Sequence, residues 1–213
     1  SLGVIRAALS KALQTQYGMP IADKYRIRIE PNIDSTKSEI YLTLSSIGEV
    51  VSGEMRLWQP RDKDVEIETE MLLKLMVFLG EDHAEAIGKI ENNTDKAGPV
   101  VNVVESENGY ASLVFPFNKK QSWRYLGWAL DELGVDIEDR DSVDGSYYIK
   151  VQPDKGFFSK LLSSTGSIES LQLYVKQTSD SSSEVYFIDL SQENKEETIA
   201  YSFQFFTAVS NKF

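Results

Sequence analysis

Segments that alternate between apolar and polar residues occur in two similar pairs along this chain. The first pair is "KYRIRIE" at 24–30 and "SEIYLTL" at 38–44, and the second is "SLQLYVKQ" at 170–177 and "SEVYFIDL" at 183–190. Alternation is typical of strands with one buried face, so each pair is predicted to form two antiparallel strands. Because 38–44 and 183–190 are also similar in sequence, the second pair is interpreted as a repeat of the first.

Each strand pair is followed by a stretch in which apolar residues recur every three or four positions. This spacing places them on one face of an α-helix. We therefore expect two tandem units of similar plan, each with a strand pair followed by a long amphipathic helix. The apolar face of the first helix, within residues 65–90, comprises Ile67, Met71, Leu75 and Phe78, and that of the second comprises Ile199, Phe203, Phe206, Val209 and Phe213.

A polar, Gly-containing stretch at 91–98 is predicted to link the two units. The first unit then covers 1–90 and the second covers 99–213. "LGVIRAALSKALQ" at 2–14 and "GFFSKLLSS" at 156–164 each precede a strand pair, and we interpret them as corresponding short helices. On that correspondence the chain begins in the middle of its first unit, and we expect it to be a fragment truncated at its N-terminus.

The second unit carries additional elements ahead of its strand pair. An Asn-Gly turn at Gly109 predicts a β-hairpin, because Asn and Gly tolerate the positive φ of tight turns. A helix is predicted over about 119–133, with Asn118 as its N-cap and Gly134 just past its end. A second hairpin is expected to end near Val151.

One aromatic residue of the helix at 119–133 lies outside the apolar face of that helix. On a helical wheel, Trp128 falls beside Arg124 on the polar face, and Tyr125 lies at its flank. Either a loop or the neighbouring unit covers Trp128, or Trp128, Tyr125 and Arg124 contact a partner, since exposed Trp and Tyr are frequent interface anchors. The core face of this helix is predicted to contain Trp123, Leu126, Leu130 and Leu133, with Ala129 at its border.

Carboxylates concentrate between Asp136 and Asp144, which suggests either a cation-binding loop or the solvent face of a hairpin. The segment "DRDSVDG" lacks the ligand spacing of a helix-loop-helix calcium site. Val135 and Ile137 alternate with acidic residues, as in a strand with one face in solvent. The hairpin is therefore favoured, and we predict no metal site and no cofactor.

The composition excludes several classes of function. There are 22 Lys and Arg residues against 33 Asp and Glu, a net charge of −11, which argues against nucleic acid as a partner. The chain has no Cys, so disulfides and thiolate chemistry are excluded. His83 is the one histidine, and no phosphate-binding or dinucleotide motif is present. We therefore expect a protein that is not an enzyme.

Residues 111–151, "ASLVFPFNKKQSWRYLGWALDELGVDIEDRDSVDGSYYIKV", resemble the start of the C-terminal domain of the BamC (NlpB) family. The family belongs to the machinery that assembles β-barrel proteins in the bacterial outer membrane. The helix within residues 65–90 is also similar to a helix of this family. The shared pattern lies at Pro116, Phe117, Trp123, Leu126, Ala129, Leu130, Gly134 and Gly145.

The resemblance implies an α+β fold with two tandem helix-grip domains, each an antiparallel sheet packed on a long C-terminal helix. It also implies a non-enzymatic scaffold subunit that associates with other subunits of the assembly complex. Family members are anchored on the periplasmic side of the outer membrane through a lipidated N-terminal cysteine, and an extended N-terminal segment binds the lipoprotein BamD. Neither that cysteine nor that segment occurs in this sequence.

A second hypothesis comes from the cavity that helix-grip folds can enclose between sheet and helix. Phe203, Phe206 and Phe213 would line such a cavity in a periplasmic carrier of an apolar small molecule or lipid. In a tightly packed unit, the same three rings fill that space instead.

Overall fold

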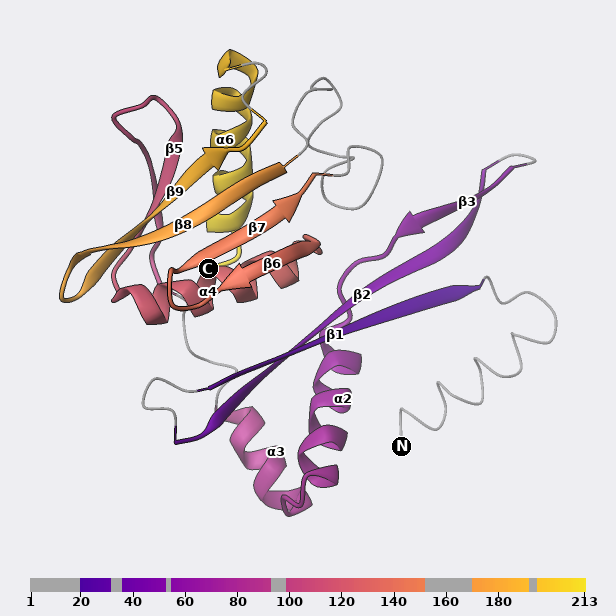
Figure 1. Cartoon of the computed structure of the whole chain (residues 1–213). Helices are drawn as coiled ribbons and strands as arrows, with labels where there is room; N and C mark the ends of the chain where they lie inside the picture. Colours follow the sequence, from indigo (N-terminus) through magenta and orange to yellow (C-terminus); the bar gives the residue numbers. More distant parts are fainter. Residues whose placement is uncertain (1–19, 32–35, 53–54, 93–98, 152–169, 192–194) are drawn as a thin grey trace. The chain divides into compact units, whose positions relative to one another are not determined.

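The computed structural model describes residues 20–31, 36–52, 55–92, 99–151, 170–191 and 195–213 (Figure 1). These residues form an α+β structure with two antiparallel sheets and four helices. The chain divides into two compact units, one comprising Ser1–Arg28 and Leu42–Ile90 and the other Ile29–Tyr41 and Glu91–Phe213. The predicted helices at 2–14 and 156–164 and most of the predicted linker lie outside the described residues.

The first sheet contains three strands in the order β1-β2-β3. The predicted strand pair is confirmed as β1 (Ile21–Pro31) and β2 (Ser38–Ser52), and β3 (Met55–Pro60) follows. The predicted helix within 65–90 is confirmed as α2 (Val65–Phe78), but it ends earlier than the segment does, and the chain then forms a further helix, α3 (His83–Glu91), that was not predicted.

The break between α2 and α3 has two local causes. Gly80 adopts a φ of 101°, a left-handed conformation that ends a helix and that glycine reaches without strain. Asp82 then caps α3, because its carboxylate accepts the backbone N–H groups of Ala84 at 2.8 Å and Glu85 at 3.2 Å. Phe78, predicted on the apolar face, lies at the end of α2 with 85% of its surface exposed.

The second sheet contains six strands in the order β4-β5-β9-β8-β7-β6. It is formed by the two predicted hairpins and the predicted second strand pair, all of which are confirmed. In chain order its elements are β4 (Asn102–Glu105), β5 (Ala111–Phe115), α4 (Lys119–Glu132), β6 (Ile137–Asp141), β7 (Ser146–Lys150), β8 (Ser170–Ser179), β9 (Ser182–Asp189) and α6 (Lys195–Ser210).

One face of the six-stranded sheet packs against α4 and α6 and forms the core of the second unit (Figure 1). The strand register places buried side chains next to one another, as in the pairs Leu173 with Phe187 and Val175 with Val185. From α4, Trp123, Leu126, Ala129 and Leu130 are buried as predicted, and Leu133 is partly buried.

Helix α6 buries more of its surface than its predicted apolar face. Phe206 and Val209 are fully buried, as expected, but so are Phe205 and, nearly, Tyr201. These two side chains project from the side of α6 that the predicted face left out. The sheet therefore holds a wider strip of α6 than one row of apolar residues indicates.

No helix in the described part of the chain is both long enough and apolar enough to cross a membrane.

Candidate interaction site on helix α4

Helix α4 is fixed to the sheet beneath it by its first turns. Asn118 caps the helix, because its side chain accepts the backbone N–H of Gln121 at 3.0 Å. The ring of Trp123 stacks on that of Tyr147 from β7 at 4.8 Å, and the Tyr147 hydroxyl donates to the Trp123 carbonyl at 3.0 Å. Together these contacts set which side chains of α4 face away from the core.

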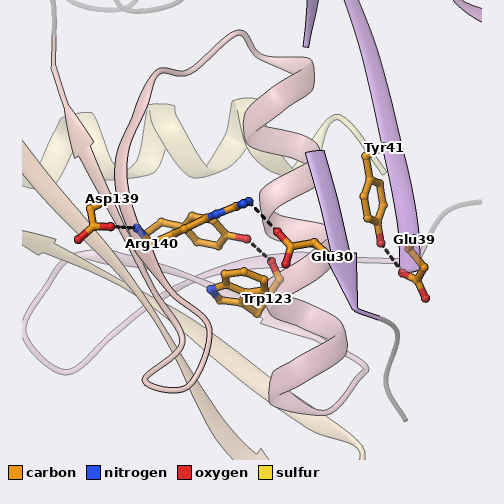
Figure 2. Close-up of polar contacts among 7 residues, drawn as sticks. Glu30, Glu39, Tyr41, Trp123, Asp139 and Arg140 are labelled. Carbon is orange, nitrogen blue, oxygen red and sulfur yellow. Dashed lines mark hydrogen bonds and ion pairs between the residues drawn. The ribbon is translucent and has the colours of Figure 1, made fainter. Parts of the chain in front are cut away.

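Arg124 lies on the predicted polar face, but it is buried rather than open to solvent. Its Nη1 donates to Oε1 of Glu39 at 3.0 Å, with the Arg124 side chain 6% exposed and that of Glu39 42% exposed. The second oxygen of Glu39 accepts the Tyr41 hydroxyl at 2.7 Å (Figure 2). The Arg124 guanidinium therefore has an internal partner on β2, in the part of that strand that groups with the second unit.

A second ion pair joins β1 to β6. Nη1 of Arg140 donates to Oε1 of Glu30 at 2.6 Å, and the backbone N–H of Arg140 donates to its neighbour Asp139 (Figure 2). The Glu30 side chain is buried whereas Arg140 is partly exposed. This pair could not be predicted from the sequence, because the two residues are 110 positions apart and belong to strands whose patterns show only alternation.

Trp128 and Tyr125 meet through the last residue of the chain, Phe213. The ring centroid of Phe213 lies 5.6 Å from that of Trp128 and 6.0 Å from that of Tyr125. Tyr125 also stacks on Phe117 at 5.1 Å. We call Phe117, Tyr125, Trp128 and Phe213 the α4 aromatic cluster, and all four side chains are partly buried.

The residues of the α4 aromatic cluster are only partly buried and lie beside a fully buried core. Partly exposed Trp and Tyr rings bury a large area on binding and lose little conformational entropy, which makes them suitable contacts for another protein. Of the three residues predicted to contact a partner, Trp128 and Tyr125 lie in this cluster, whereas Arg124 forms an ion pair with Glu39.

The three phenylalanines of the carrier hypothesis lie in different surroundings. Phe206 is fully buried, with ring centroids of Phe187 and Phe205 at 6.1 Å and 5.7 Å. Phe203 is partly buried, and Phe213 belongs to the α4 aromatic cluster. Around Phe206 the aromatic rings pack against one another. The carrier hypothesis stays a prediction.

Two acidic residues of the β6–β7 hairpin, Asp141 and Asp144, accept hydrogen bonds within its turn. The Asp141 carboxylate accepts the backbone N–H groups of Val143 at 2.8 Å and Asp144 at 2.9 Å, and Asp144 accepts the Ser146 hydroxyl at 2.5 Å. These contacts agree with the hairpin that the sequence analysis favoured.

On β9, a hydrogen bond to Glu184 raises the pKa of Tyr186 to about 12, which moves that tyrosine further from neutral pH.

Residues 101–209 match the sequence model of a known class of domain, described as the outer membrane protein assembly factor BamC-like C-terminal domain. This match covers half of the chain and contains the six-stranded sheet, α4 and most of α6. The chain belongs to the BamC family.

Curated relatives extend the similarity beyond that domain. Outer membrane protein assembly factor BamC of Accumulibacter regalis is 32% identical over 168 residues, which are 74% of this chain and 44% of the relative. BamC of Thiobacillus denitrificans is 34% identical over 172 residues, covering 74% of this chain and 45% of the relative. BamC of Shewanella sediminis is 33% identical over 104 residues. The chain thus spans less than half the length of the curated relatives that it matches.

Proposed function

We propose that this protein is a non-enzymatic interaction subunit of the machinery that assembles β-barrel proteins in the outer membrane. Membership of the BamC family supports the process, because its relatives bear the name outer membrane protein assembly factor. The observation that supports a role in protein binding is the α4 aromatic cluster, a partly buried group of aromatic residues next to the core of the second unit. The partners are other subunits of the assembly complex.

We further propose that the protein acts on the periplasmic face of the outer membrane. In the full-length form, the lipidated N-terminal cysteine implied by the family resemblance would hold it there. A single lipid anchor leaves the folded units in water, where their surfaces are open to neighbouring subunits.

The tandem helix-grip plan, with units at 1–90 and 99–213 joined by 91–98, is also a proposal. It is supported by a polar contact that occurs in both strand pairs. The Tyr41 hydroxyl donates to Glu39 at 2.7 Å on β2, and the Tyr186 hydroxyl donates to Glu184 at 2.8 Å on β9. The Glu-x-Tyr positions coincide when 38–44 is aligned with 183–190, as expected for a duplicated unit.

The contact role of the α4 aromatic cluster is tested by substituting Trp128→Ala and measuring binding to the purified assembly complex by surface plasmon resonance. We expect the Kd to rise at least roughly tenfold, because removing a Trp anchor commonly costs about 2 kcal/mol or more and a tenfold change in Kd corresponds to about 1.4 kcal/mol. Val143→Ala is the matched control, because Val143 is also an apolar residue of this unit and lies exposed in the β6–β7 turn.

Urea unfolding of each variant separates lost binding from lost structure. A Trp128→Ala protein that keeps its fold and binds like the Val143→Ala control would remove the cluster as the contact surface.

A further inference from the structure

Strand β3 forms an edge of the three-stranded sheet and is exposed along its whole length. It has a single neighbour, β2, in the described sheet, and all six of its residues are exposed. Three of them are large apolar side chains, Met55 at 63%, Leu57 at 42% and Trp58 at 52% exposure. An edge strand presents backbone N–H and C=O groups along its outer side, and this one adds apolar side chains to them.

The register shows how these side chains are distributed over the two faces of the sheet. Leu57 pairs with Val50, which is also exposed, so the two apolar side chains lie next to each other on one face of the sheet. Trp58 pairs with Glu49 and lies on the opposite face, since neighbouring residues of a strand alternate. A segment that adds to β3 would therefore meet apolar side chains on both faces of the sheet.

The other edge strands in the described sheets carry features that discourage pairing. Strand β6 has a bulge between Ile137 and Asp139 and exposed acidic residues, and β4 has only four residues. By contrast, β3 has one charged residue, Arg56, which pairs with Glu49 of its own sheet at 3.5 Å. The opposite edge of the same sheet, β1, has exposed charged residues at Asp23 and Lys24, beside the exposed side chains of Ile27 and Ile29.

We propose that the outer edge of β3 binds an extended segment of an unfolded outer-membrane protein by β-strand addition. This inference rests on the proposed function and names a client for it. A backbone edge selects an extended chain, and exposed apolar side chains select one in which apolar and polar residues alternate. Strands of outer-membrane β-barrels have that alternation, at about ten residues each.

A second copy of this chain is a less suitable occupant of the edge. The net charge of −11 on each chain opposes self-association at low ionic strength. Pro60 ends β3 and has no backbone N–H, so an antiparallel pair of β3 strands would lose a donor at both ends.

The test is fluorescence anisotropy with the whole chain and a labelled peptide of about ten residues that alternates valine with threonine. The key comparison is the same peptide with N-methyl groups on the residues that face β3, because N-methylation removes backbone donors and keeps the side chains. We expect the unmodified peptide to bind and the N-methylated peptide to bind at least roughly tenfold more weakly.

Substitution of the edge itself provides the matched protein variants. Leu57→Lys puts a charge on the exposed edge strand and is expected to weaken peptide binding by a similar factor. Val143→Lys makes the same change at an exposed apolar residue of the second unit, in a turn rather than on an edge strand, and should leave binding unchanged. Circular dichroism of both variants checks that each is folded.

Equal affinity for the two peptides, or unchanged binding by Leu57→Lys, would overturn strand addition at β3. A dimer in sedimentation that Leu57→Lys dissociates would assign the edge to a second copy and overturn the client proposal. A chain that binds the purified assembly complex but not the peptide would remove this inference and leave the proposed function standing.

Discussion

Arg124 and Trp128 show how single residues on one helix face acquire different environments. Both fall on the polar side of α4 on a helical wheel, yet Arg124 is buried in an ion pair with Glu39 and Trp128 packs against Phe213. A wheel records only the faces of its own helix. The partner of Arg124 is 85 positions away, and that of Trp128 is the last residue of the chain. Local periodicity therefore identified Trp128 as unusual but could not indicate what it touches.

The ion pair between Arg124 and Glu39 is expected to stabilise the second unit. Glu39→Gln keeps the shape of the side chain and removes its charge, which leaves a buried guanidinium without its carboxylate. We expect the free energy of unfolding to fall by about 1–3 kcal/mol, measured by urea denaturation. Glu138→Gln, an exposed acid on β6, is the control and should change stability by less than about 0.5 kcal/mol. Equal effects of the two substitutions would show that the pair adds nothing.

At the scale of elements, strands and helix ends follow from short-range signals. Alternation predicted β1, β2, β8 and β9, and Asn118 with Gly134 predicted both ends of α4 within about one residue. The break between α2 and α3 was missed although Gly80 and Asp82 mark it, because a single Gly does not by itself end a helical pattern. Sheet order was not predicted either, since β5 pairs with β9, far along the chain, rather than with the next strand.

Gly145, in the turn between β6 and β7, is an element-scale feature that a substitution can test. Its φ is 87°, and a Cβ there would lie 3.0 Å from the Val175 carbonyl oxygen and against the Lys119 side chain. Gly145→Ala should therefore lower the free energy of unfolding by about 1–3 kcal/mol. Gly88→Ala in α3 is the control, because nothing lies within 4 Å of its added Cβ, and it should leave stability unchanged or raise it by up to about 1 kcal/mol. Thermal unfolding measures both, and a Gly145→Ala protein as stable as the parent contradicts this account of the turn.

At the scale of the whole molecule, composition excluded classes of function, and membership of the BamC family supports the proposed process. The net charge of −11 and the absence of Cys excluded classes of chemistry, but they pointed to no partner. The pattern around Trp123, Leu130 and Gly134 provided the resemblance, and the match over 101–209 then established the family. The proposed edge at β3 could not be predicted, because it depends on which side chains the fold leaves exposed, as it does for Leu57. Trp128, by contrast, could be singled out from the helical wheel.

The central claim is that this protein is an interaction subunit of the outer-membrane β-barrel assembly machinery. The most direct measurement is affinity purification of the full-length protein from detergent-solubilised outer membranes, followed by mass spectrometry of the proteins that co-purify. The account predicts that subunits of the assembly complex are retained in amounts comparable to the protein itself, and that they remain after a wash in moderate salt. Recovery of the protein without any member of that complex would contradict it.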